Sequence, residues 1–180
     1  MKKQIPFLLL LTAVLLTGCN FDGDSNYTPA IQFIAYPYTQ NGDTLNIKTT
    51  GESGVYLLDS IQVGDTVFFQ LGLNAYTNNL VSFRLTKSVD SAGDFLFPPV
   101  ASLDSIFSHT NSDYGQGKFV FLSGFNAVYF PFHFAAKSAT NDEILQFSLV
   151  SDAQFDDVYG SNVTSFKLKT PIKPAAVVEE

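Results

Sequence analysis

The sequence predicts an all-β fold, an antiparallel β-sandwich of about eight or nine strands, and three observations support this. Apolar and polar residues alternate along many short segments, which places one side of each segment in a core and the other toward water. The chain holds 18 Phe and 8 Tyr, and aromatic residues favour strands. Gly and Asn separate the segments at short intervals, as turns require. Alternating short strands are also compatible with a β-barrel, which is the alternative fold.

The first half of the body alternates most clearly. Turn-forming stretches at 40–43, 50–54, 63–65 and 77–79 divide it into strands. The side chains expected to face the core are Ile31, Phe33 and Ala35, then Leu45 and Ile47, then Val67, Phe69, Leu71 and Leu73, and finally Val81, Phe83 and Leu85.

The middle of the chain is less regular. Val100, Leu103, Ile106 and Phe107 have helical spacing behind Pro98-Pro99. We therefore expect at most one short helix, near residues 100–108, followed by a loop over 112–117.

Strand patterns return after this segment and continue to residue 170. The expected core residues here are Val128, Phe130, Phe132, Phe134, Leu145, Phe147, Leu149, Phe166 and Leu168. Pro131 has no N–H to donate, so its strand should lie at an edge or be bulged there. The sandwich domain is thus assigned to residues 30–170, and residues 171–180, with two prolines, should form a loose tail.

Two stretches of the body resemble immunoglobulin-like domains. Residues 59–69 contain Val-Gly-Asp-Thr-Val before a core strand, and residues 144–153 end in Leu-Val-Ser-Asp-Ala. The resemblance implies an immunoglobulin-like sandwich, without the Cys and Trp residues that mark antibody domains.

The first 18 residues have the form of a secretory signal: basic Lys2 and Lys3, an apolar run over 5–16, then small residues. The run is too short for a permanent membrane helix. Its end, Leu16-Thr17-Gly18-Cys19, resembles the lipobox of exported lipoproteins of Bacteroides-type bacteria. The resemblance implies cleavage between Gly18 and Cys19 and a lipid on Cys19 that anchors the protein in the outer membrane. The sequence does not distinguish the cell surface from the periplasmic face of the membrane. The composition of residues 19–29 predicts a flexible tether.

The charge balance limits the partners. The chain has 10 basic and 17 acidic residues, a formal net charge of −7, and loss of the signal segment would make the body more acidic. This argues against nucleic acid and against electrostatic attachment to anionic lipid. The membrane contact should therefore be the lipid on Cys19.

No motif for catalysis, metal or cofactor stands out, and we do not expect an enzyme. His109 and His133 have no second ligand at zinc spacing, and His133 reads as the polar-face residue of a strand. Acidic loops at 141–143 and around Asp152, Asp156 and Asp157 leave a calcium site open, although the spacing fits no known calcium loop.

Two groups of surface residues remain as candidate sites. Asp followed by Ser or Thr and a small or apolar residue resembles an O-glycosylation acceptor of Bacteroides-type bacteria, which makes candidates of Thr44, Ser60, Ser91 and Ser105. Tyrosines replace the missing Trp as candidate glycan contacts: Tyr36, Tyr38, Tyr76, Tyr114 and Tyr129. The expected role is a non-catalytic binding or structural sandwich in the envelope, whose partner is another envelope protein or a polysaccharide. The alternative is a surface glycan-binding module of a nutrient-uptake system.

Overall fold

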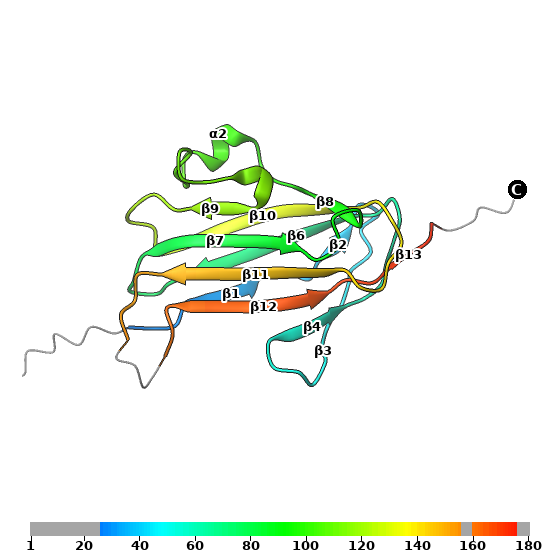
Figure 1. The fold of residues 1–180 in the computed structure, drawn as a ribbon, viewed down its shortest axis with the longest axis horizontal. Helices are drawn as coiled ribbons and strands as arrows, with labels where there is room; N and C mark the ends of the chain where they lie inside the picture. The colour runs from blue at the N-terminus through cyan, green and yellow to red at the C-terminus, as the bar shows by residue number, and fades with distance from the viewer. Residues whose placement is uncertain (1–25, 156–159, 176–180) are drawn as a thin grey trace, which may run out of the picture.

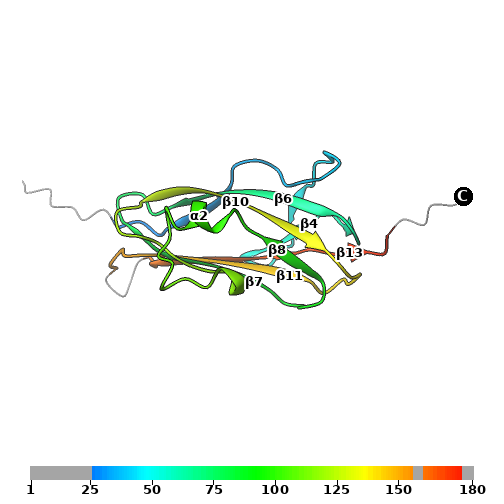
Figure 2. The same ribbon diagram turned by 90° about the horizontal axis from the view of Figure 1, so that it is seen from above.

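The alternating segments form two sheets that pack face to face, as the computed structural model of residues 26–155 and 160–175 shows (Figure 1, Figure 2). Sheet A has the order β1-β6-β10-β8, with β2 also paired to β6. Its strands are β1 (Ala30–Phe33), β2 (Tyr38–Thr39), β6 (Thr66–Asn74), β8 (Gly93–Leu96) and β10 (Ala127–Ala136). The two layers confirm the all-β sandwich.

Sheet B has the order β3-β4-β12-β11-β7-β9. Its strands are β3 (Ile47–Thr49), β4 (Val55–Leu58), β7 (Leu80–Lys87), β9 (Lys118–Val120), β11 (Ile144–Ser151) and β12 (Val163–Lys169). A third, two-stranded sheet pairs β5 (Ile61–Gln62) with β13 (Ile172–Lys173).

The strand count and the pairing both differ from the prediction. The described part of the chain contains 13 strands, because edge strands of two to four residues are too short to show an alternating pattern. The sheets are also mixed rather than purely antiparallel, since β12 pairs β4 in parallel and β13 pairs β5 in parallel.

Phenylalanines fill the space between the sheets. Phe69 and Phe132 stack with ring centroids 4.8 Å apart, and Phe147 stacks on Phe166 at 4.5 Å. The largest fully buried side chains are Phe69, Phe83, Phe107, Phe119, Phe130, Phe132, Phe134 and Phe147. Buried aromatic side chains of this kind make a large contribution to the hydrophobic stabilisation of the sandwich.

Most of the predicted core residues are buried, Ile31, Phe33 and Ile47 are partly buried against the core, and two are exposed. Val81 is 41% exposed because β7 has a register shift against β11: Ser82 lies opposite Val150 and Leu80 opposite Ser151, which leaves Val81 as an extra residue. Ala35 is exposed because it lies between β1 and β2, where the edge of sheet A is interrupted.

A short helical insertion lies beside one edge of the sandwich, as Figure 1 shows. It contains α2 (Val100–Leu103) and the 3-10 helix η1 (Tyr114–Gln116). The helix predicted near 100–108 is confirmed in position but has only four residues. Leu103 at the end of this helix and Phe107 in the turn after it are the buried anchors of the insertion.

Pro131 lies within β10, which pairs with both β6 and β8. The strand is therefore not an edge strand along its whole length. Its pairing with β8 begins only at His133, so at Pro131 one side of β10 has no partner and the missing N–H costs no ladder bond.

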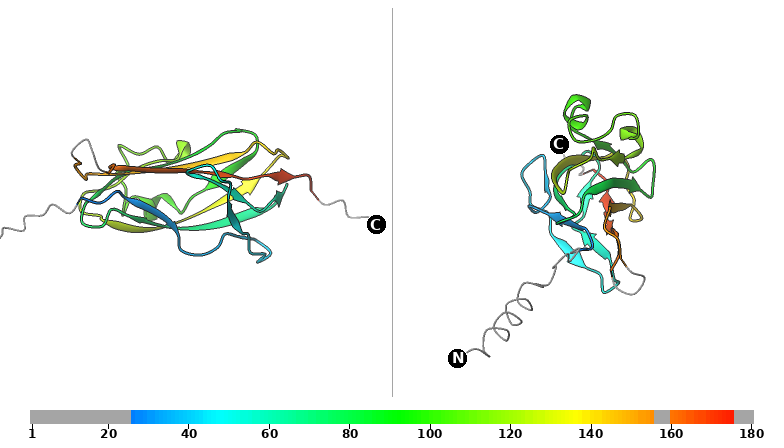
Figure 3. Two further views of the ribbon diagram at one scale, coloured as in Figure 1. Left: turned by 90° about the horizontal axis from the view of Figure 1, so that it is seen from below. Right: turned by 90° about the vertical axis from the view of Figure 1, so that its left-hand side faces the viewer.

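Both ends of the sandwich domain extend beyond the predicted boundaries. Residues 26–29 belong to the predicted tether, yet Asn78 Nδ2 donates to Asn26 Oδ1 at 3.1 Å, and Asn26 Nδ2 donates to the Gln154 carbonyl. In the predicted loose tail, Ile172 is 2% exposed and pairs with Ile61. The described chain thus enters at one end of the sandwich and reaches β13 at the opposite end (Figure 3, left).

Candidate functional site: the aromatic face of sheet A

The outer side of sheet A carries several large aromatic and apolar side chains in two groups, with Gln70 and Pro131 between them. Residues at even positions of β6 and odd positions of β10 point away from the core, because their neighbours Val67, Phe69, Phe132 and Phe134 are buried. We call this surface the aromatic face; it consists of Ile34, Tyr36, Tyr38, Phe68, Tyr129 and His133.

Three rings form a row across three strands. Tyr38 on β2 lies opposite Phe68 on β6, which lies opposite His133 on β10. The rings of Tyr38 and Phe68 are parallel within 5°, with centroids 5.0 Å apart, and the centroids of Phe68 and His133 are 4.1 Å apart. On the next strand, Leu96 lies opposite His133 and is 46% exposed, which extends the row to the edge of the sheet.

A second exposed group lies around Gly72. Gly72 on β6 lies between Gln32 and Tyr129. Side-chain atoms of Ile34 come within 3.4 and 3.5 Å of the place where a Cβ on Gly72 would stand. The Ile34 side chain therefore lies over the glycine on the outer face. Ile34 is 57% exposed and Tyr129 52%, so this group faces solvent.

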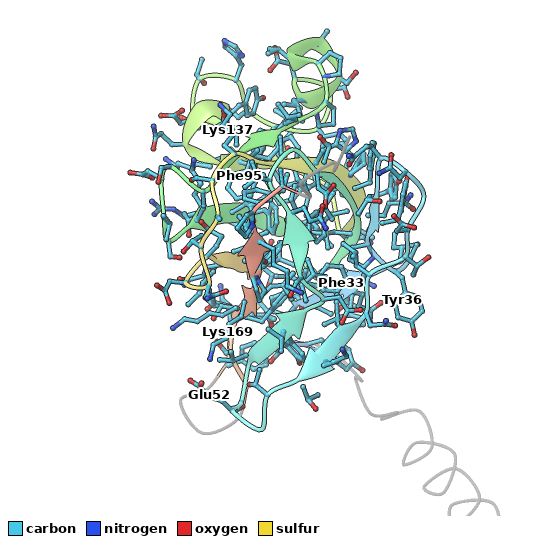
Figure 4. All side chains as sticks on the ribbon, turned by 90° about the vertical axis from the view of Figure 1, so that its right-hand side faces the viewer. Phe33, Tyr36, Glu52, Phe95, Lys137 and Lys169 are labelled. Carbon is cyan, nitrogen blue, oxygen red and sulfur yellow. The ribbon has the colours of Figure 1, made fainter. Side chains whose placement is uncertain are left out.

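The interruption between β1 and β2 creates a groove beside these residues. Phe33 pairs with Leu71 and Tyr38 with Phe68, so the edge strand gains two residues over β6 and the chain bends outward. The resulting groove has a volume of about 390 Å³ and is lined by Phe33, Ile34, Ala35, Tyr36, Pro37 and Ile47. Figure 4 shows Phe33 toward the body and Tyr36 at the outer margin.

The aromatic face is uncharged although the chain is acidic. Burial lowers the pKa of His133 below its usual range, so its imidazole is neutral at pH 7. The only carboxylate on the strands of sheet A is Asp94, and it is engaged by Lys87 at 3.6 Å and by Lys137. An uncharged aromatic surface can bury apolar area on a partner without desolvating a charge.

Three of the five candidate tyrosines belong to this face, and the structure separates the other two from it. Tyr76 lies in the turn after β6 with a φ of 60°, its ring centroid 5.4 Å from that of Tyr27. Tyr114 lies in η1 and is packed against Phe119 with centroids 5.6 Å apart.

The hydroxyl of Tyr114 is also occupied. It donates to Asp104 Oδ1 at 2.8 Å, and burial and this carboxylate raise the pKa of Tyr114 to about 12. Tyr114 therefore has a packing role, and we do not place it in a binding site.

Sequence reasoning missed Ile34, Phe68 and Leu96 as site residues. Alternation along the strand predicts that Phe68 faces outward, because Val67 and Phe69 on either side of it face inward. Ile34 was likewise predicted to face outward, because Ile31 and Phe33 face inward, but no sequence pattern indicates the two-residue interruption beside it, which depends on how β2 pairs with β6.

The four candidate glycosylation hydroxyls, on Thr44, Ser60, Ser91 and Ser105, are all on exposed residues. Exposure of the hydroxyl is a requirement for this modification.

In the acidic loops that the structure describes, carboxylates accept hydrogen bonds from backbone N–H groups of neighbouring turns. Asp152 accepts from the Asn79 backbone N–H at 2.7 Å and from its side-chain amide at 2.8 Å. Glu143 is buried and accepts from the Ser88 and Val89 N–H groups at 3.0 and 3.3 Å. Among residues 26–155 and 160–175, no three His, Cys, Asp or Glu side chains gather into a group able to hold a metal ion. Asp156 and Asp157 lie outside these ranges.

The lipobox residues Leu16, Thr17, Gly18 and Cys19 also lie outside the described residues. Within the described part, no helix has the length and apolar character to cross a membrane.

Comparisons with other proteins assign no family to the fold and the surface described above. No family model matches the chain, and a search of curated proteins found no match.

Proposed function

We propose that this chain is a lipid-anchored protein of the outer membrane whose non-catalytic β-sandwich binds a partner through the aromatic face. The observation that carries the proposal is the row of Tyr38, Phe68 and His133 across three strands, flanked by exposed Ile34 and Tyr129. Half-exposed rings and exposed apolar side chains gathered on one face of a sheet are typical of interaction sites.

The position of the proposed lipid anchor is compatible with binding through the aromatic face. If Cys19 carries the lipid, seven Cα–Cα steps join it to Asn26, a distance of at most about 25 Å when extended. Asn26 is fixed to the body through Asn78 and Gln154. The lipid would thus hold one end of the sandwich near the membrane and leave the aromatic face free at its side.

A protein of the envelope is the partner that the surface suits best. Tyr38 and Phe68 turn their ring planes toward one another, and exposed Ile34 and Leu96 add aliphatic area beside them. Tyr, Phe and aliphatic side chains without charge are typical of the centre of a protein interface.

A glycan is the second candidate, and the exposure of Tyr36 (66%) and Tyr129 (52%) favours it. Their rings have no stacking partner among the described residues. An amphipathic ring of this kind can pack against a sugar while its hydroxyl remains hydrogen bonded.

Site-specific photocrosslinking tests the proposal in the native host. A photoreactive residue at position 129 should give one discrete adduct with an envelope protein, and Phe68→Ala in the same chain should reduce it. The matched control places the crosslinker at position 76, another exposed tyrosine away from the face. Equal adducts at 76 and 129 would show that the aromatic face is not the binding surface.

A glycan array with the purified chain separates the second candidate from the first. Binding to one neutral polysaccharide class, lost in Tyr36→Ala or Tyr129→Ala and retained in Tyr76→Ala, identifies a glycan-binding module.

The anchor has its own test. Cys19→Ser should move the protein from the membrane fraction to the soluble fraction, and loss of the acyl mass should accompany this. A membrane-bound Cys19→Ser protein would refute the lipid anchor.

A further inference from the structure

The strands of sheet B carry six basic residues and no carboxylate, in a chain with 17 acidic residues. The acidic residues lie in the rest of the chain, so positive charge is concentrated on sheet B and negative charge lies outside its strands. Such a division creates a local positive field on a molecule whose net charge is negative.

Four of these cations share the outer side of the sheet. Arg84 on β7 lies opposite Lys118 on β9 and Ser148 on β11. Lys167 and Lys169 on β12 lie opposite Gln146 and Ile144. Their strand neighbours, including Phe83, Leu85, Phe119, Phe166 and Leu168, are buried, so the four side chains are directed away from the core.

The remaining two basic residues of the sheet are already neutralised. Lys48 Nζ lies 2.6 Å from Asp59 Oδ1, and Lys87 Nζ donates to the Asp90 carbonyl at 2.7 Å and lies 3.6 Å from Asp94 Oδ1. In contrast, none of Arg84, Lys118, Lys167 and Lys169 forms an ion pair within the described residues.

Hydroxyl and amide groups lie between these cations. Ser148 is opposite both Arg84 and Ser165, and Gln146 is opposite both Thr86 and Lys167. We name the surface made by these residues the basic face: Arg84, Thr86, Lys118, Gln146, Ser148, Ser165, Lys167 and Lys169. Figure 1 looks onto sheet B, with β7, β11 and β12 in front.

We propose that the basic face binds an acidic polysaccharide. Strands lie about 4.8 Å apart, so the three steps from β9 to β12 span roughly 14 Å. One extended polymer lying across the strands can therefore reach the Arg84–Lys118 pair and the Lys167–Lys169 pair. Its carboxylate or sulfate groups meet the cations, and its hydroxyl groups meet Gln146, Ser148 and Ser165 as hydrogen-bond partners.

The surroundings of the basic face favour a narrow polymer over an anionic membrane. Exposed carboxylates of Glu52, Asp90, Asp142 and Asp152 lie in loops that lead into or out of the strands of sheet B. A broad anionic plane would bring all four carboxylates against like charge, whereas a single chain across the strands meets fewer of them; Glu52 and Asp90 line hollows beside Lys167 and Arg84.

This site is distinct from the aromatic face, which lies on the opposite side of the sandwich (Figure 2). Failure of either proposal leaves the other standing, because the variants of one face do not touch the other.

The test measures binding of the full chain, immobilised from detergent, to dextran sulfate and polygalacturonate, with unmodified dextran as the uncharged control. We expect both acidic polymers to bind, dextran not to bind, and the affinity to fall steeply with salt. Equal binding of dextran and dextran sulfate would overturn the proposal, and so would tighter binding of phosphatidylglycerol vesicles than of either polymer.

Charge variants locate the site. An exposed charge contact changes Kd by about fivefold, so Arg84→Gln/Lys118→Gln and Lys167→Gln/Lys169→Gln should each weaken binding by roughly 25-fold. The matched control is Lys137→Gln/Lys173→Gln, which removes the same charge elsewhere on the exposed surface and should change Kd less than threefold. An equal loss in the control double variant would refute the assignment to the basic face.

A single substitution at the centre of the face gives an independent readout. Ser148→Glu introduces a carboxylate opposite Arg84 and should weaken binding by at least tenfold, while Ser148→Gln, of nearly equal size, should not. Far-UV circular dichroism and the thermal midpoint confirm that both variants fold. Equal binding by folded Ser148→Glu and Ser148→Gln would contradict the proposal.

Discussion

Ile172 should be a structural anchor of the sandwich although it lies in a segment that the sequence marks as a loose tail. Its side chain is 2% exposed and belongs to the main hydrophobic core. β13 is also held by four backbone hydrogen bonds: Ile61 N–H to Pro171 O (3.0 Å), Val63 N–H to Lys173 O (2.9 Å), Thr140 N–H to Ile172 O (2.9 Å) and Ile172 N–H to Thr140 O (2.7 Å).

Ile172→Ala leaves those backbone bonds in place and removes only the buried side-chain carbons. Loss of a buried Ile to Ala costs about 2–5 kcal/mol, depending on how far the cavity collapses. Because β13 is a two-residue strand in a small separate sheet and can relax, we expect about 2–3 kcal/mol. For a domain of this size that corresponds to a decrease of roughly 4–12 °C in Tm.

Equilibrium urea denaturation, followed by circular dichroism, measures this directly. The midpoint should fall with little change in the m-value. Lys173→Ala, an exposed neighbour on the same strand, should change the unfolding free energy by less than about 0.5 kcal/mol. If Ile172→Ala were as stable as Lys173→Ala, the segment after Thr170 would not be part of the folded domain.

Three further predictions test other parts of the structure. Lys48 and Asn46 lower the pKa of Asp59 to about 2, so its stabilising effect is present above pH 4 and lost as the pH falls toward 2. In urea titrations at several pH values, Asp59→Asn should be less stable than the parent at pH 6, and the difference should shrink steadily between pH 4 and pH 2; a difference as large at pH 2 as at pH 6 would contradict this. Gly117 has a φ of +63°, and a Cβ there would stand 2.1 Å from the Leu85 carbonyl oxygen, so Gly117→Ala should cost at least about 1–3 kcal/mol in urea denaturation, while Gly115→Ala, with 3.5 Å to its nearest neighbour, should cost less than 1 kcal/mol. Mass spectrometry of the protein from its native host should find a glycan on at least one of Thr44, Ser60, Ser91 and Ser105, and four unmodified hydroxyls would end the glycosylation hypothesis.

Local alternation was sufficient to predict which side of the long strands is buried. Val67, Phe69, Leu71 and Leu73 on β6 and Val128, Phe130, Phe132 and Phe134 on β10 are all in the core. In these strands the period of two continues over eight or more residues, so a single register accounts for every side chain.

Alternation failed where the pairing of two strands decides the outcome. Val81 faces solvent because of a bulge against β11, and Ala35 because β2 rejoins β6 two residues out of step with β1. Short strands such as β2, β5 and β13 escaped prediction for a related reason: two residues have no period, and only their partners hold them extended.

The candidate sites show the same division. Exposed tyrosines were recognisable from the sequence as possible contacts, but the selection of Tyr36, Tyr38 and Tyr129, and the exclusion of Tyr114, depend on which strands become neighbours. The basic face could not be recognised from the sequence at all, since Arg84, Lys118 and Lys167 are separated by up to 83 positions and meet only through the strand order of sheet B.

The sequence by itself determined the all-β class and most of the inward-facing residues, because strand periodicity and aromatic content are local properties of the chain. It also carries the signal and lipobox pattern on which the proposed anchor rests. Only the tertiary structure decided where the sandwich ends, which rings form one surface and which cations remain unpaired. These features arise from contacts between residues far apart in the chain, and no local pattern encodes such contacts.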